Sequence, residues 1–132
     1  MTHEPTATVL LVEDFDGWRY QERKLLLAHP EWKIVSEACD GAEGVRKAAE
    51  LRPDIILLDI GLPKLNGIEA ARRIRHASPH VHIVFVTENR DKDIRDTALR
   101  IKGTRHVLKS NAATELVPAI ESALADRYTA TL

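Results

Sequence analysis

The chain has 132 residues, 19 basic and 20 acidic side chains, a formal net charge of -1 and a single cysteine, Cys39. This length suits one domain with one core, and the balanced charge argues against a general attraction to nucleic acid or to an anionic membrane. One cysteine excludes an intrachain disulfide and is typical of a reducing compartment, so we expect a cytoplasmic protein. No signal peptide, membrane span, internal repeat or linker is evident, which leaves a single domain as the expectation.

The first half of the chain predicts two strand–helix pairs followed by a third strand. After a flexible leader at residues 1–7 come a strand at 9–12, a helix from about 16 to 28, a strand at 32–38, a helix at 42–51 and a strand at 55–58. The second strand alternates imperfectly between apolar and polar residues, which favours an edge position. The third strand is a run of four aliphatic residues, a pattern typical of a strand buried on both faces.

The second half of the chain continues this alternation to the end. A helix from 68 to about 76, a strand at 83–86, a helix at 91–101, a strand at 106–108 and a helix from about 114 to 127 precede a tail at 128–132. For Arg72, Arg73 and Arg75 on the first of these helices, a solvated face is favoured over a phosphate-binding patch. The helix at 91–101 has a thin apolar stripe, which suits a movable element. Pro118 must lie near the first turn of the last helix or kink it.

Strand and helix predictions alternate five times between residues 8 and 127, which we assign to one domain. Parallel neighbouring strands need long crossover connections, and helices of this length provide them. The alternation therefore predicts an α/β fold with a doubly wound, five-stranded parallel sheet, written (βα)5.

Polar side chains stand at the ends of four of the five predicted strands. Glu13 and Asp14 follow the first strand, Asp59 the third, Thr87 the fourth and Lys109 the fifth. In a parallel sheet these carboxyl ends open on the same edge, so the side chains should converge on one crevice. Any one of them could merely cap or turn the chain. Their coincidence on four strands favours a functional site.

The chemistry of that site follows from its charges. Two carboxylates about 4 Å apart repel by on the order of 4 kcal/mol at an effective dielectric near 20, so three acids need a cation or one must keep a proton. An all-oxygen ligand set favours Mg²⁺ over Zn²⁺. Lys109 can hold an anion, and the Thr87 hydroxyl can donate to an incoming oxygen. This set of residues predicts phosphoryl transfer. The chain has no Walker loop, so a nucleotide is not the obvious donor. The central carboxylate, Asp59, can itself accept the phosphoryl group as an acyl phosphate.

The polar strand ends stand in short motifs that resemble a known family. Val-Glu-Asp, Leu-Leu-Asp with Pro63 four residues on, Val-Thr and Val-Leu-Lys, in this order, resemble the receiver domain of two-component response regulators over about residues 7–127. The resemblance implies a flavodoxin-like sheet of strand order 2-1-3-4-5. It also implies that Asp59 accepts a phosphoryl group from a sensor histidine kinase or a phosphotransfer protein.

The resemblance implies a magnesium site as well. Asp14, Asp59 and the backbone carbonyl of Gly61 would hold Mg²⁺, with Glu13 acting through a water. Such a domain is a regulatory phosphoacceptor rather than an enzyme with a separate substrate, and it catalyses only its own phosphorylation and dephosphorylation.

The resemblance further implies a conformational switch. Lys109 would pair with the acyl phosphate, Thr87 would turn to hydrogen-bond it, and His106 would fill the space released while the helix at 91–101 shifts. The changed surface would meet an unknown downstream protein or a second copy, as in a homodimer. The phrase Lys-Ser-Asn-Ala-Ala-Thr-Glu-Leu is similar to receivers that usually carry a helix-turn-helix output domain. No such domain is evident here, so this chain is not expected to bind nucleic acid.

Four residues depart from the family pattern. Glu88 places an acid where Ala or Gly is common, and it would repel the phosphoryl group or hinder small donors unless it points to solvent. His106 stands where Tyr or Phe is common, and a plain ring substitute is favoured over a pH-sensitive switch. Arg105 stands where Gly is common. Ser110 replaces a proline after Lys109, where a cis bond to serine would cost about 2.5–4 kcal/mol.

Three other interpretations of the residues are open. Asp-Phe-Asp-Gly, beginning at Asp14, resembles the opening of haloacid-dehalogenase-like phosphatases, in which Asp14 would be the nucleophile, but the later acidic pair of that family is lacking. A receiver-like binding module that signals without phosphorylation is the second, supported by Glu88 and His106. A metal site made of the three histidines within residues 76–82 is the third, although loop and edge histidines are commoner.

Overall fold

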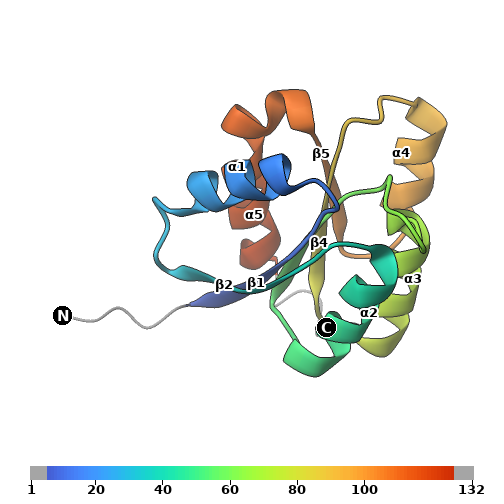
Figure 1. The fold of residues 1–132 in the computed structure, drawn as a ribbon, viewed down its shortest axis with the longest axis horizontal. Helices are drawn as coiled ribbons and strands as arrows, with labels where there is room; N and C mark the ends of the chain where they lie inside the picture. The colour runs from blue at the N-terminus through green and yellow to red at the C-terminus, as the bar shows by residue number, and fades with distance from the viewer. Residues whose placement is uncertain (1–5, 127–132) are drawn as a thin grey trace.

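The computed structural model describes residues 6–126, in which strands and helices alternate throughout (Figure 1). In chain order the elements are β1 (Ala7–Val12), α1 (Asp16–Leu26), β2 (Trp32–Ala38), α2 (Gly41–Leu51), β3 (Ile55–Leu58), α3 (Gly67–Ala77), β4 (His82–Thr87), α4 (Lys92–Leu99), β5 (Thr104–Leu108), the 3-10 helix η1 (Lys109–Asn111) and α5 (Ala112–Ala125). Every predicted strand and helix is present. Residues 1–5 of the predicted leader, residue 127 and the predicted tail at 128–132 lie outside the described residues.

The five strands form one parallel sheet in the order β2-β1-β3-β4-β5, which confirms the predicted fold and strand order. β2 is an edge strand, as its imperfect alternation indicated. The pairing of β1 with β2 shifts between Val9, which faces Ile34, and Leu10, which faces Ser36. Val35 is therefore the extra residue of an irregularity, and this explains why the apolar pattern of β2 slips out of phase.

Helices cover both faces of the sheet, with α1 and α5 on one face and α2, α3 and α4 on the other (Figure 1). The strand residues of the core beneath α2, α3 and α4 are Leu10, Val12, Ala38, Ile56, Leu58, Ile83 and Phe85. Those of the core beneath α1 and α5 are Ala7, Val9, Leu11, Trp32, Ile55, Leu57, Val84, Val86 and Val107. All four residues of β3 are buried, as expected for the central strand. No helix within residues 6–126 is long and apolar enough to cross a membrane.

Two strands begin two residues earlier than predicted because partners distant in the sequence extend them. The N–H of Ala7 donates to the carbonyl of Glu31, which starts the pairing of β1 with β2. At the other edge the N–H of Ile83 donates to the carbonyl of Gly103, and Thr104 then pairs with Ile83. Such extensions depend on the neighbouring strand, so the local hydrophobic pattern does not reveal them.

α5 begins at Ala112, directly after η1, and this places Pro118 in the second turn. Pro118 therefore does not lie near the first turn, which was the first of the two alternatives predicted for it. Proline has no N–H, so the carbonyl of Thr114 loses its usual helical donor. Both Thr114 and Pro118 are exposed, which lets water hydrogen-bond that carbonyl in place of the missing N–H.

Arg75 on α3 is not part of a solvated face, in contrast to the prediction. The side chain is half-buried, and burial lowers the pKa of its guanidinium. Its nitrogens donate to the carbonyls of Lys102 at 2.8 Å, of Ser78 and Pro79 at 3.0 Å each, and of Gly103 at 3.3 Å. Arg75 thus joins the end of α3 to the segment that leads into β5. Arg72 and Arg73, by contrast, are exposed.

We expect Arg75→Met to lower the free energy of unfolding by about 2 kcal/mol, because several backbone carbonyls would lose a charged donor. Arg73 is the matched control, since it is exposed and its Nε lies 3.6 Å from a Glu69 carboxyl oxygen. Arg73→Met should change the free energy of unfolding by less than about 0.5 kcal/mol. Urea denaturation measures both values, and equally small losses would contradict the bridging role of Arg75.

Candidate functional site

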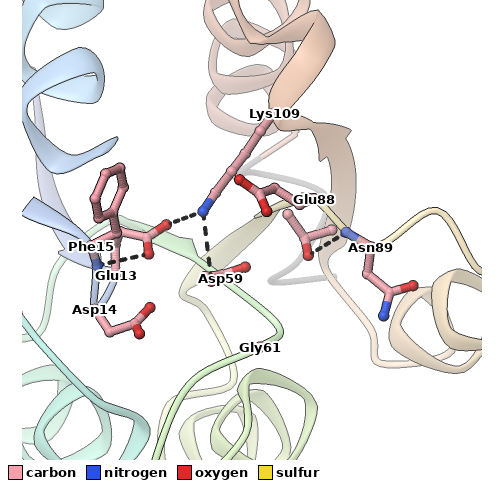
Figure 2. A pocket seen from close by; sticks show the side chains of 9 residues that line it. Glu13, Asp14, Phe15, Asp59, Gly61, Glu88, Asn89 and Lys109 are labelled. Atoms are coloured by element: carbon pink, nitrogen blue, oxygen red, sulfur yellow. Dashed lines mark hydrogen bonds and ion pairs between the residues drawn. The ribbon is translucent and has the colours of Figure 1, made fainter. Parts of the chain in front are cut away.

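The carboxyl ends of β1, β3, β4 and β5 meet in one crevice (Figure 2). Parallel pairing aligns Val12 with Leu58 and Leu58 with Phe85, so the following residues leave the sheet at the same level. The crevice has a volume of about 600 Å³. It is lined by Glu13, Asp14, Phe15, Asp59, Gly61, Thr87, Glu88, Asn89 and Lys109. The five side chains predicted from the strand ends therefore lie together, and Gly61 lies with them.

Three carboxylates face one another in the crevice (Figure 2). Glu13 is 1% exposed and Asp59 is 8% exposed, whereas Asp14 is open to solvent. One oxygen from each of them lies within 4.8 Å of the other two. No other group of three or more His, Cys, Asp or Glu side chains in the described part of the chain converges in this way. The alternative site made of the histidines within residues 76–82 is therefore wrong.

Glu13 is held by the start of the loop and helix that follow β1. Its Oε2 accepts a hydrogen bond from the N–H of Phe15 at 3.1 Å, and its backbone carbonyl accepts one from Arg19 at 2.6 Å. Burial raises the pKa of Glu13 above its ordinary value; the hydrogen bond from Lys109 opposes that rise and the charge of Asp59 adds to it. A cation close by would favour the ionised carboxylate.

Lys109 supplies the positive charge in the crevice. Its Nζ lies 2.6 Å from Glu13 Oε1 and 3.7 Å from Asp59 Oδ2, and its side chain is 10% exposed. Burial by itself lowers the pKa of Lys109, but the hydrogen bond to Glu13 and the charge of Asp59 outweigh burial and leave the pKa raised. The amine is therefore charged at neutral pH. Figure 2 shows it reaching across the crevice toward both acids.

Thr87 ends β4 and is buried at the side of the crevice. Its Oγ1 accepts a hydrogen bond from the N–H of Asn89 at 3.1 Å. This contact uses the hydroxyl oxygen as an acceptor, so the hydroxyl proton remains available for donation to another oxygen.

The loop after Asp59 is fixed by a close approach of α3 to the end of β3. The N–H of Gly67 donates to the carbonyl of Ile60 at 2.7 Å, and the N–H of Asp59 donates to the carbonyl of Val12 at 3.0 Å. A Cβ at Gly67 would lie only 2.0 Å from the carbonyl oxygen of Asp59. A Cβ at Gly61 would meet no atom within 4 Å. Gly67 is therefore required for packing against the end of β3, and Gly61 is not.

Three residues that support the site were not predicted. Phe15 and Asn89 act through backbone N–H groups, which leave no signature in residue type. Arg19 donates to the Glu13 carbonyl and pairs with Asp16, three residues earlier on α1. Asp and Arg at this helical spacing are a recognisable signal of a surface pair. The hydrogen bond from the same arginine to the end of β1, in contrast, is visible only in the folded chain.

The structure shows the surroundings of three of the departures from the family pattern. Glu88 is exposed and lines the crevice, and its negative charge contributes to the raised pKa of Lys109. The bond between Lys109 and Ser110 is trans, as are all peptide bonds within the described residues. Arg105 pairs with Asp126 beyond the end of α5. An arginine in place of a small residue here thus joins β5 to the last helix.

His106 lies outside the crevice, in a separate groove of about 790 Å³ between α4, β5 and α5. The ring is half-buried, and its Nε2 has no hydrogen-bond partner among residues 6–126. Burial lowers the pKa of His106, and the charge of Arg95 lowers it further. An uncharged ring at neutral pH fits a plain substitute for an aromatic residue better than a pH-sensitive switch.

The sequence of this chain matches a family model and is similar to two known regulatory proteins. A family model described as response regulator receiver domain matches residues 9–121. The nitrate/nitrite response regulator protein NarL of Escherichia coli strain K12 is 33% identical over 126 residues, which cover 95% of this chain and 58% of NarL. The transcriptional regulatory protein LiaR of Bacillus subtilis is 35% identical over 115 residues, which cover 87% of this chain and 54% of LiaR. The chain thus spans little more than half the length of these relatives.

Solved structures share the fold. The crystal structure of a two-component response regulator of the LuxR family from Aurantimonas has a TM-score of 0.86 and 36% sequence identity to this chain. The superposition covers 92% of this chain and 86% of that one. The similarity therefore extends across all the strands that bring the crevice residues together.

We expect Gly67→Ala to lower the free energy of unfolding by about 1–3 kcal/mol, because the new methyl group forces α3 away from the end of β3. The shift also moves Asp59, so the affinity of the crevice for Mg²⁺ should fall. Gly61→Ala is the control for stability and should change the free energy of unfolding by less than about 0.5 kcal/mol, since open space surrounds that position. Urea denaturation and Mg²⁺ titration followed by tryptophan fluorescence measure the two effects. Similar behaviour of the two variants would contradict the packing role of Gly67.

Proposed function

Because this chain belongs to the response regulator receiver domain family, we propose that Asp59 accepts a phosphoryl group from the phosphohistidine of a sensor histidine kinase or of a phosphotransfer protein. The chain is thus a receiver domain of a two-component response regulator, and its role is regulatory. The observation that carries the proposal is the position of the Lys109 ammonium, 3.7 Å from Asp59, in a crevice where three carboxylates converge. A carboxylate next to a fixed cation is suited to accept and hold a phosphoryl group.

The carboxylates of Asp14 and Asp59 and the backbone carbonyl of Gly61 would hold Mg²⁺, with Glu13 acting through a water. The donor set fits this ion, because all the ligands are oxygens and the three carboxylates lie within 4.8 Å of one another. Bound Mg²⁺ would neutralise the carboxylates and the negative charge of the phosphoryl oxygens. The mixture of two buried acids and one exposed acid leaves the crevice open on the side of Asp14.

Phosphoryl transfer would form a bond between a carboxylate oxygen of Asp59 and phosphorus while the phosphorus–nitrogen bond of the donor breaks. The electron pair of that bond stays on the imidazole nitrogen, which then takes up a proton. Lys109 places positive charge beside the reacting oxygens and would pair with the acyl phosphate. The only reactions assigned to the domain are its own phosphorylation and dephosphorylation.

The phosphorylated crevice would change the surface on the side of α4 and β5. The phosphoryl group adds negative charge and acceptor oxygens, to which the free hydroxyl proton of Thr87 can donate. His106 would then move into the space that Thr87 leaves, and α4 would shift with it. The anchoring of α4 is weak, since Ala98 is its one buried residue. The groove between α4, β5 and α5 is where a downstream protein or a second copy would bind.

A receiver-like binding module that works without phosphorylation is the second candidate. Glu88 favours it, because a fourth carboxylate lines the crevice and would repel an incoming phosphoryl group. The family match argues against the phosphatase alternative, in which Asp14 would be the nucleophile. DNA binding is not proposed for residues 1–132, and a cytoplasmic location remains a prediction from the single cysteine.

We expect acetyl phosphate and Mg²⁺ to label Asp59 and to change the fluorescence of Trp18, whose ring lies 5.4 Å from Lys109 Nζ. Asp59→Asn should abolish labelling and keep the fold, because the amide cannot form an acyl phosphate. Asp93→Asn, at an exposed position on α4, is the matched control and should label as the native chain does. Mass spectrometry locates the label. Label on Asp14 would support the phosphatase alternative, and no label with either acetyl phosphate or a kinase would support the binding module.

Acidification should weaken Mg²⁺ binding. The loss should begin at a higher pH than it would for a glutamate with the ordinary pKa. The pKa of Glu13 is raised, so its carboxylate takes up a proton, and loses its attraction for the ion, at a pH above 4.5. Below that raised pKa the affinity should drop by up to about tenfold per pH unit. Mg²⁺ titrations at several pH values test this, and Glu13→Gln should weaken and flatten the dependence. Affinity that stays constant down to pH 4.5 would contradict the role of Glu13.

A further inference from the structure

α1 carries a buried acid that phosphoryl transfer does not use. Glu22 is 2% exposed, and together with Leu26 one turn later it forms the buried face of the helix. Leu26 belongs to the apolar core beneath α1 and α5, so the carboxyl group faces apolar surroundings. The Oε1 atom has no hydrogen-bond partner among the described residues. A buried polar group without a partner destabilises the fold, which calls for a reason why it is present.

The electrostatic surroundings of Glu22 connect it to the crevice. Burial raises the pKa of Glu22 well above its ordinary value, and the charge of Glu13 raises it further. The charge of Lys109 and the neighbouring Trp18 indole oppose the rise, and Asp59 adds to it. The uncharged acid is the form that this environment favours. Glu22 therefore lies behind the crevice and is linked to it electrostatically.

Trp18 lies between this acid and the lysine of the crevice. It precedes Glu22 by four residues, so the two side chains share one side of α1. The indole N–H is buried and has no partner in hydrogen-bonding geometry among residues 6–126, although it is close enough to influence the Glu22 carboxyl. The Lys109 ammonium lies over the indole ring, 5.4 Å from its centroid. One side chain thus adjoins both groups.

Among residues 6–126, the ammonium of Lys109 has three close neighbours of different character, and Glu88 acts on it from beyond ion-pair distance. Two are carboxylates, Glu13 and Asp59, whose attraction for the ammonium weakens when a bound cation neutralises them. The third is the indole face of Trp18, whose attraction for the ammonium does not depend on that neutralisation. A four-carbon side chain has many conformations, so a neutral contact that restricts it favours the reactive position.

We propose that Trp18 and Glu22 form a positioning pair for Lys109: the indole face keeps the ammonium within reach of Asp59, and the buried carboxyl group fixes the indole. The inference rests on the proposed phosphoacceptor role of Asp59. Neither residue touches the phosphoryl group, so both act through Lys109. When a cation compensates Glu13, the indole is the contact that retains the ammonium at the crevice.

Trp18→Leu tests the first half of the pair. We expect labelling of Asp59 by acetyl phosphate and Mg²⁺ to slow by about fivefold, because the leucine offers no π face to the ammonium. The Mg²⁺ dissociation constant, measured by nuclear magnetic resonance titration, should stay within about twofold. Trp18→Phe keeps an aromatic face and should recover most of the rate. Tyr20→Leu, which removes an exposed aromatic ring from the same helix, is the matched control and should label at the native rate.

Glu22→Leu and Glu22→Gln test the second half. The leucine variant removes a buried polar group from an apolar face, so its thermal midpoint should rise by about 3–8 °C while labelling slows by about threefold. The glutamine variant keeps a neutral polar group of the same shape and should label within about twofold of the native rate. A more stable protein that labels more slowly is a result that a purely structural role of Glu22 would not produce.

A spectroscopic measurement tests the geometry directly. The ε-methylene protons of Lys109 should show an upfield ring-current shift in the native chain, and Trp18→Leu should abolish it. Absence of that shift, or native labelling rates in both leucine variants, would overturn the proposal. An equal loss of Mg²⁺ affinity and labelling rate would also overturn it, since the residues would then be supporting the whole site. If the native chain does not label but the shift is present, the proposed function fails while the contact itself stands.

Discussion

The structure depends on one electrostatic constraint: two buried carboxylates, Glu13 and Asp59, share the single ammonium of Lys109. These groups directly follow β1, β3 and β5, which are far apart in the sequence. A buried charge is tolerated only when its partner is close, so the three strands must end at the same level of the sheet. The parallel order β2-β1-β3-β4-β5 satisfies that condition, because β1 and β3 pair in register and β4 carries the alignment on to β5.

The remaining parts of the fold hold these strand ends in position. The close approach of Gly67 to the carbonyl of Asp59 fixes the loop on one side of the crevice. Arg19 binds the carbonyl of Glu13 on the other side. Behind the crevice, the α1 face formed by Trp18 and Glu22 adjoins Lys109. α4, in contrast, has little buried surface, so the molecule combines a rigid site with one weakly anchored helix.

Much of this fold is predictable because local patterns of apolar and polar residues specify its strands and helices. The four aliphatic residues of β3 and the strict alternation of strands and helices indicated a parallel sheet, and both are present. The residues at the strand ends indicated the site before any geometry was known. The errors have a common cause. The local pattern puts Arg75 on a solvated face and starts β5 two residues late, because the true position of each depends on backbone groups from another part of the chain.

The sequence by itself determined the order of strands and helices and the chemical types gathered at the carboxyl edge of the sheet, since hydrophobic periodicity and strand-end residues are local properties. The tertiary structure alone decided which of these groups are buried. Glu13 is enclosed and Asp14 is exposed although they are adjacent in the chain, and Glu22 lies in an apolar layer although it is a charged residue type. Burial, and with it the pKa and the strength of each ion pair, is set by residues brought in from distant segments, and no local pattern specifies them.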